Sequence, residues 1–316
     1  MNKPETPASV IPVLAFFLVP TVMLLAGYVL FPYPPPLRAT QLSYVPLFLG
    51  LILLGAGFLW RQKSTGSTLK TAGWMLFAAF WSTMPSFLYL SEDGDIFNAS
   101  VCVIGVYILV YLAYQEWLSR KRNDHPESLN WIAGATFLAG IIYFTFEIAI
   151  PSLKDWFILF VAAQSTDLLH LLGVNATRVD SVIVYNNTPI TIIFACTAIQ
   201  SMVLFVGMIG AINRAAVKRR VFGLLVTVVP IYFLNLVRNA GVVIMVGNGM
   251  VSFDIAHNVI GKLASLLALI LLLLLTFKVV PEMYDEILGI VNLTKRQGPV
   301  ELFIARVLGK KHDATR

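Results

Sequence analysis

The chain has 316 residues, of which 58% are hydrophobic and 13% are charged, and its mean hydropathy is +0.78. Average proteins contain about 25% charged residues, so this composition excludes an ordinary soluble domain and indicates a polytopic membrane protein. The formal net charge of +6 does not indicate nucleic-acid binding, because Lys and Arg occur in short clusters between apolar runs, as topology determinants do.

Apolar segments long enough to cross a bilayer follow one another along the chain. A helix needs about 20 residues to span a hydrocarbon layer of roughly 30 Å. Segments of about this length lie at residues 10–31, 44–60, 69–90, 96–118, 131–150, 194–213, 222–246 and 257–280. We therefore predict an all-α polytopic membrane protein with about eight transmembrane helices.

The positions of the basic clusters predict the orientation of the chain. Lys3 and the clusters within residues 61–70, 120–122, 214–220 and 278–316 all fall on one side when eight spans are threaded with both termini on that side. Basic loops are retained in the cytoplasm. We therefore predict a cell-membrane protein with both termini cytoplasmic, and an extracytoplasmic segment at residues 151–193.

This segment has two halves of different character. Residues 153–173 carry large apolar side chains interspersed with polar ones, as in an amphipathic helix lying in the membrane interface. Residues 178–193 alternate and are rich in Val and Ile around Asn186 and Asn187, which predicts a short β-hairpin before the sixth span. An open edge of this hairpin is suited to hold a substrate by strand addition.

These elements divide the chain into four parts. They are a five-span N-terminal scaffold (1–150), the extracytoplasmic helix and hairpin (151–193), a three-span core (194–280) and a cytoplasmic amphipathic tail (281–316).

Three chemically active side chains fall at a similar depth in the predicted core. Cys196 lies at the outer start of the sixth span, Arg238 is inside the seventh span, and His257 begins the eighth. An arginine within a span costs about 2.5–3.5 kcal/mol on insertion scales, so it needs a protein partner, a hydrated cavity or a bound anion. We predict that these three residues form one catalytic site at the extracytoplasmic face.

The roles of these residues follow from their chemistry. A thiolate near a helix N-terminus and a cation is favoured, which makes Cys196 a candidate nucleophile. A neutral imidazole can accept the thiol proton near pH 7, so His257 is a candidate base. Cys102 lies within a predicted span and is interpreted as a buried thiol. A Cys102–Cys196 disulfide and a purely structural Arg238 remain alternatives.

Further polar residues are candidates for other roles. Lys262 and Glu147 are candidates for an ion pair with each other or for reaching the interface. The spacing of His, Cys and carboxylates does not match a metal site, and no cofactor is expected. The residues expected to contact the substrate are Gln200, Asn239, Asn258 and Tyr185.

Three short motifs carry a resemblance to a known family. The sequences ACTAIQS at 195–201, LVRN at 236–239 and HNVIG at 257–261 occur in this order on consecutive predicted spans. They resemble the exosortase/archaeosortase family, and most of all its archaeosortase A branch. The resemblance is strongest between residues 188 and 266. It implies that Cys196 and Arg238 are catalytic, with His257 at the third position.

The resemblance also implies a function. The family's enzymes are thought to be cysteine transpeptidases that recognise a C-terminal sorting signal, consisting of a short motif, a transmembrane helix and a basic tail, on secreted surface proteins. They cleave near the motif, and the archaeal members are linked to lipid attachment. The expected partners are therefore such proteins and a membrane lipid. Two other functions remain open, a transporter or channel with Arg238 as an anion site and a non-enzymatic assembly partner for surface proteins.

Overall fold

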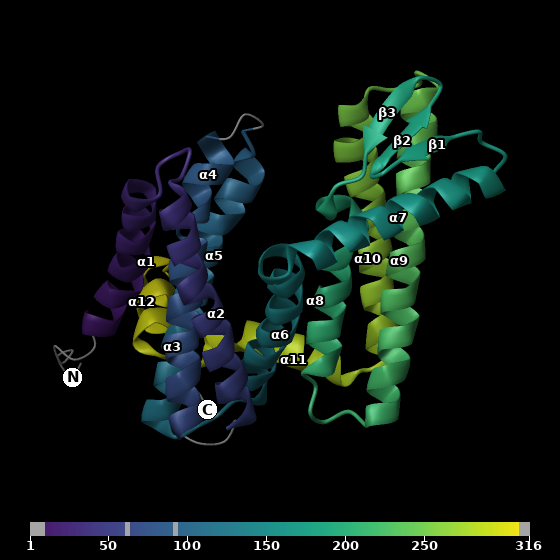
Figure 1. Ribbon diagram of the computed structural model, residues 1–316. Helices are drawn as coiled ribbons and strands as arrows, with labels where there is room; N and C mark the ends of the chain where they lie inside the picture. Colours follow the sequence, from purple (N-terminus) through teal and green to yellow (C-terminus); the bar gives the residue numbers. More distant parts are fainter. Residues whose placement is uncertain (1–9, 61–63, 91–93, 310–316) are drawn as a thin grey trace, which may run out of the picture. The chain divides into compact units, whose positions relative to one another are not determined.

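The computed structural model describes residues 10–60, 64–90 and 94–309 (Figure 1). The predicted basic residues Lys3, Arg61 and Lys63 lie outside these ranges, as do residues 91–93. The end of the predicted tail, 310–316, which includes Lys310, Lys311 and Arg316, also lies outside them. The described part is mostly helical and carries one small sheet.

The elements follow one another along the chain with short connections. The helices before the sheet are α1 (Val10–Leu30), α2 (Leu37–Leu59), α3 (Ser64–Trp81), α4 (Met84–Leu90), α5 (Ile96–Arg122), α6 (Glu127–Phe144), the π-helical η2 (Thr145–Ala149) and α7 (Pro151–Leu171). The strands are β1 (Thr177–Val179), β2 (Val182–Tyr185) and β3 (Thr188–Thr191). The helices after the sheet are η3 (Phe194–Thr197), α8 (Ile199–Gly210), α9 (Val217–Gly247), η4 (Ile255–Gly261), α10 (Lys262–Val279), α11 (Glu282–Asn292), η5 (Leu293–Lys295) and α12 (Pro299–Val307).

The polytopic helical architecture is confirmed, although the count of eight spans is not reproduced. Six helices of the described chain are long and apolar enough to cross a membrane: Val10–Leu30, Leu37–Leu59, Ile96–Arg122, Glu127–Ala149, Val217–Gly247 and Ile255–Val279. The predicted segment 69–90 is divided between α3 and α4, because the helix is interrupted at Ser82 and Thr83. The predicted segment 194–213 begins with a 3-10 helix, which leaves α8 only 12 residues long.

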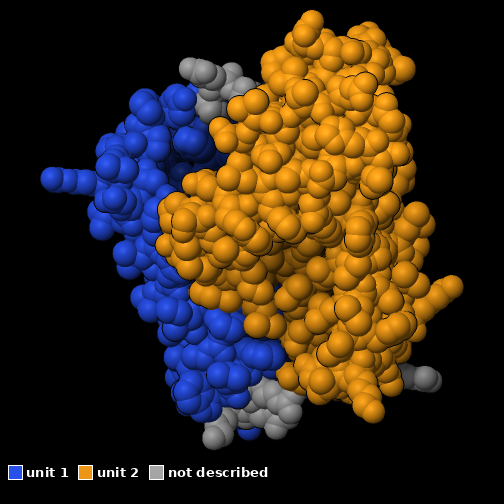
Figure 2. All heavy atoms as spheres, turned by 45° about the vertical axis from the view of Figure 1, so that its right-hand side comes forward, with its two compact units in different colours: residues 1–137, 286–316 blue, residues 138–285 orange. Residues whose placement is uncertain are grey.

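The chain forms two compact units, coloured separately in Figure 2. The first contains residues 1–137 and 286–316, and the second contains residues 138–285. The predicted catalytic residues all lie in the second unit.

In the first unit, α2 and α3 approach each other closely through glycines. A Cβ atom at Gly66 would lie 2.0 Å from the Trp60 carbonyl oxygen, and one at Gly57 would lie 2.4 Å from Cγ of Lys70. Small residues allow helix backbones to approach in this way. The Lys70 side chain extends over Gly57 into the interior, where its Nζ lies 2.9 Å from Glu116 Oε1 on α5 and 3.3 Å from Asn130 Oδ1 on α6.

The predicted C-terminal tail contributes α12 to the first unit. Glu301 of α12 accepts hydrogen bonds from Tyr111 (2.7 Å), Tyr114 (3.1 Å) and Gln115 (2.5 Å) of α5. Val300, which is fully buried, packs beside Tyr114. Helix α12 is therefore docked by a polar network rather than by its apolar face alone.

The second unit contains the sheet and the helices that support it. The predicted hairpin is confirmed as β2 and β3, with Asn186 (φ 49°) and Asn187 (φ 61°) in the left-handed turn. A third strand, β1, pairs with β2, so the sheet is antiparallel in the order β1-β2-β3. The helix predicted at 153–173 is confirmed as α7, which crosses α9 in Figure 1 and packs against it.

The buried ion pair of the first unit predicts a stability effect. Lys70→Met leaves the Glu116 carboxylate buried without its cation and should destabilise the protein by about 3–5 kcal/mol. The double variant Lys70→Met/Glu116→Leu should recover most of this loss, because neither charge is then buried alone. Thermal unfolding in detergent measures both. Equal unfolding temperatures for the wild type and the single variant would contradict the prediction.

Candidate active site

Cys196 lies in the 3-10 helix η3, which links the sheet to α8. Its N–H donates to the Ile193 carbonyl oxygen at 2.8 Å. Ala198 follows with φ 59°, a left-handed conformation that costs a non-glycine residue about 1–2 kcal/mol, and α8 begins only after it. A separate, tightly constrained turn therefore lies between the thiol and the start of α8.

Two asparagines of α9 hold the carbonyl oxygen of Cys196. Asn235 Nδ2 donates to it at 2.8 Å and Asn239 Nδ2 at 3.1 Å. The asparagines are four residues apart, so both lie on one face of α9. Asn239 also reaches Ser165 Oγ of α7 at 3.4 Å. All three side chains are buried, and together they fix the backbone of Cys196 to two helices.

The side chain of Cys196 is only 4% exposed and lies in an apolar cluster. Its neighbours in this cluster come from α7, the sheet and α9, for example Val161, Ile192 and Leu236. Cys196 precedes α8 and lies outside the six apolar spans.

Arg238 lies between the asparagine pair and the start of α10. Its guanidinium packs against Gly261 of η4, where a Cβ atom would lie only 2.9 Å from Nε. The Nε atom is buried and donates to none of the residues that the structure describes. The charge of Arg238 acts on both the Cys196 thiol and the His257 imidazole, so it is central to the three predicted catalytic residues.

His257 is half-buried in η4, four residues before Gly261. Its ring stacks on Phe253 with centroids 5.2 Å apart and an interplanar angle of 11°. No hydrogen bond joins His257 to Cys196 among the described residues. The next residue, Asn258, is exposed and donates to Asp254 Oδ1 at 2.6 Å, so its amide is occupied at the surface of the turn.

Gln200 lies one turn beyond Cys196, in the first turn of α8. Its Nε2 donates to the Tyr143 hydroxyl at 2.9 Å. Both residues line a cavity of about 740 Å³ beside the segment that carries Cys196. The cavity is also lined by Ala195 and by Glu147, which hydrogen-bonds Tyr143. Glu147 thus belongs to this cavity, where the Lys154 charge also acts on it, rather than to a pair with Lys262.

Tyr185 lies at the turn end of β2 and contacts the C-terminal end of α9. Its hydroxyl donates to Asn248 Oδ1 at 3.3 Å, and Asn186 donates to the Gly247 carbonyl at 3.2 Å. A Cβ atom at Gly247 would lie 2.3 Å from the Tyr185 ring. These contacts fasten the hairpin to the end of α9.

Some residues of the site have no signal in the sequence. Ser165 and Tyr143 lie in helices whose polar residues have no distinctive spacing, and only the fold brings them to Asn239 and Gln200. In the described part of the chain, no group of three or more His, Cys, Asp or Glu side chains is arranged to hold a metal ion. Cys102 and Cys196 are both free thiols.

The chain is similar to known proteins over most of its length. The family described as transmembrane exosortase matches residues 14–274. The chain belongs to this family. Archaeosortase A of Haloferax volcanii is 26% identical over 292 residues, covering 80% of this chain and 93% of the relative. Archaeosortase A of Natronomonas pharaonis is 27% identical over 275 residues, covering 74% and 84%. No solved structure matches the chain.

The packing of Arg238 on Gly261 predicts the effect of a small substitution at Gly261. Gly261→Ala places a methyl group 2.9 Å from Arg238 Nε and should displace the guanidinium. Because a nearby cation favours the thiolate, alkylation of Cys196 by a neutral maleimide at pH 8 should slow by about three- to tenfold.

Gly241→Ala is the matched control, because a Cβ atom there meets nothing within 4 Å. Its alkylation rate should equal that of the wild type. Equal rates for the Gly261→Ala variant and the wild type would show that Arg238 does not act on the thiol through this contact.

Proposed function

We propose that this protein is a membrane-embedded cysteine transpeptidase that processes secreted surface proteins. It recognises a C-terminal sorting signal composed of a short motif, a transmembrane helix and a basic tail, cleaves near the motif through a Cys196 thioester, and transfers the protein to a membrane lipid. Membership of the transmembrane exosortase family and the similarity to two proteins named Archaeosortase A support this function.

The observation that carries the proposal is the buried donor of Arg238. Its Nε has no acceptor among the described residues, although buried donors are almost always paired. It lies near a thiol whose backbone is fixed by Asn235 and Asn239. A substrate carbonyl oxygen bound to Arg238 would satisfy this donor. The same contact would strengthen as the oxygen becomes an oxyanion, which is the requirement for transition-state stabilisation.

The proposed reaction has two steps. Cys196 Sγ attacks the carbonyl carbon of the scissile peptide bond while its proton passes to His257, and Arg238 stabilises the oxyanion. The C–N bond then breaks, and the leaving amine takes the proton from His257. In the second step an acceptor group of a lipid, or water in its place, loses its proton to His257 and attacks the thioester. The thiolate leaves and is protonated again.

The proposal includes a topology. We assign eight spans by counting α3 with α4 as one and η3 with α8 as another, in addition to the six longer helices. Both termini are then cytoplasmic, and the site lies at the extracytoplasmic face, where secreted substrates are available. The distribution of Lys and Arg supports this orientation.

Cys196→Ser tests the nucleophile. Processing of a co-expressed protein with a C-terminal motif, transmembrane helix and basic tail should fall by about 10³-fold or more, because a serine lacks the reactive thiolate. Immunoblotting follows the loss of the precursor, and mass spectrometry of the new C-terminus identifies the acceptor.

Cys102→Ser is the matched control, because it also removes one free thiol and should leave processing unchanged. Normal processing by Cys196→Ser would exclude the transpeptidase and leave the transporter or the assembly partner. A free carboxyl terminus as the only product would support cleavage but exclude lipid transfer.

His257→Ala tests the base. In a Cys102→Ser background, the rate of Cys196 alkylation should fall near pH 7 and recover at higher pH, where the thiol ionises without help. His170→Ala is the control, since His170 contacts the Ala176 carbonyl oxygen instead. Superimposable rate profiles for wild type and His257→Ala would remove His257 from this role.

A further inference from the structure

One edge of the sheet leads directly to Cys196. Ile192 donates to the Ser181 carbonyl oxygen at 2.8 Å, in the same register that joins β3 to β2, so these residues form a hydrogen-bonded pair. In an antiparallel ladder such pairs alternate with pairs whose backbone groups point away. The backbone groups of Pro189, Thr191 and Ile193 therefore point to the edge of β3 that has no partner strand in the described part of the chain.

The chemistry of this edge restricts where another strand can pair. Pro189 has no N–H and cannot donate. Thr191 is exposed, and neither its N–H nor its carbonyl oxygen is hydrogen-bonded to any residue in the described ranges. At Ile193 the carbonyl oxygen already accepts from the Cys196 N–H. Thr191 is therefore the residue of the edge that offers both a donor and an acceptor, five residues before Cys196.

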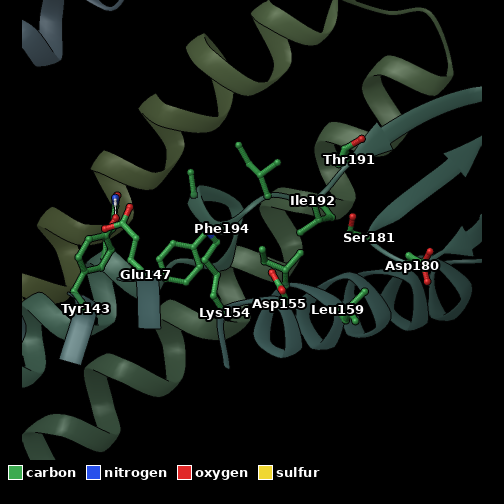
Figure 3. Close-up of a pocket in the computed structure, with 14 residues that line it drawn as sticks. Tyr143, Glu147, Lys154, Asp155, Leu159, Asp180, Ser181, Thr191, Ile192 and Phe194 are labelled. Atoms are coloured by element: carbon green, nitrogen blue, oxygen red, sulfur yellow. Dashed lines mark hydrogen bonds between the residues drawn. The ribbon is translucent and has the colours of Figure 1, made fainter. Parts of the chain in front are cut away.

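The cavity of about 740 Å³ lies where this edge ends (Figure 3). One wall is the segment from Thr191 to Ala195, and the opposite wall is the first half of α7, including Asp155 and Leu159. Cys196 directly follows the first wall. A chain that pairs with Thr191 therefore has room for its side chains beside the segment that leads to Cys196.

The charged residues that line the cavity limit which substrate side chains it can accept. The carboxylates of Glu147, Asp155 and Asp180 line it together with a single amine, that of Lys154. Lys154 lies 6.0 Å from the centre of the Phe194 ring. An acidic side chain would be repelled by this excess of carboxylates, whereas neutral and basic side chains would not.

We propose that the substrate segment next to the scissile bond binds as an extended fourth strand on Thr191, with its non-acidic side chains in the cavity. The inference rests on the proposed function and specifies how this chain holds its peptide substrate. Main-chain hydrogen bonds to Thr191 supply affinity, and the cavity supplies selection against Asp and Glu. Cys196 then meets the carbonyl that follows the paired residues.

A proline at position 191 tests the pairing, because it removes the edge N–H. With the full-length protein in lipid nanodiscs and a substrate carrying the sorting signal, Thr191→Pro should raise KM by about fivefold and change kcat less than twofold. Arg178→Pro is the matched control, because it removes the N–H that faces outward on β1, at the opposite edge, and should process normally.

Two readouts separate a failed pairing from a failed function. Unchanged Cys196 alkylation in Thr191→Pro shows that the site is intact. An unchanged KM in that variant would overturn the pairing while leaving the transpeptidase in place, whereas normal processing by Cys196→Ser would overturn the function itself.

Disulfide trapping tests the pairing without proline. Thr191→Cys, in a chain lacking Cys102 and Cys196, is oxidised with substrates that carry one cysteine at successive positions before the scissile bond. Pairing predicts crosslinks at alternate positions, because strand side chains alternate between faces. Crosslinks of equal yield at every position, or none, would overturn the proposal. In a substrate that crosslinks, glutamate two residues from its cysteine, on the same face of the strand, should reduce the yield severalfold, and arginine there should not.

Discussion

The arrangement of the site depends on the carbonyl oxygen of Cys196 and its two asparagine donors. A polar backbone group in a turn surrounded by apolar side chains must be paired, since leaving it unpaired costs about 1–3 kcal/mol. Asn235 and Asn239 meet this need from one face of α9, and Ser165 connects the second amide to α7. The position of the thiol is therefore set by α9 and α7, rather than by the helix that follows it.

Arg238 is positioned by the same helix, α9, and by the absence of a side chain at Gly261 of η4. It follows Asn235 by three residues and precedes Asn239 by one, and its guanidinium reaches Gly261 of η4. Gly261 leaves the space that the guanidinium occupies. The wide turns of η4 bring His257 to the same region, and its ring is held by Phe253. One helix thus fixes both the backbone of the candidate nucleophile and the cation beside it.

Hydropathy predicts long apolar helices well, because each must satisfy its own backbone in a bilayer. It does not reveal the interruption at Ser82 and Thr83, nor the 3-10 helix before α8, since the apolar sequence continues past each of them. The β2–β3 turn was predictable from Asn186 and Asn187, whereas the short, exposed β1 has no apolar alternation to signal it. The contact of Asn239 with the Cys196 carbonyl oxygen has no signal in the sequence, because it depends on packing between distant segments.

The burial of Cys196 bears on the choice between lipid and water as acceptor. The thiol is 4% exposed, and Cys196 is not among the residues that line the neighbouring cavity, although Ala195 is. In the proposed mechanism a thioester at this position would form within an apolar cluster, where bulk water has little access and an amphiphilic acceptor can approach from the membrane. Low water access slows hydrolysis of the intermediate without slowing attack by a bound lipid. The apolar surroundings of the thiol would then favour transfer over hydrolysis, with the charge of Arg238 stabilising the thiolate.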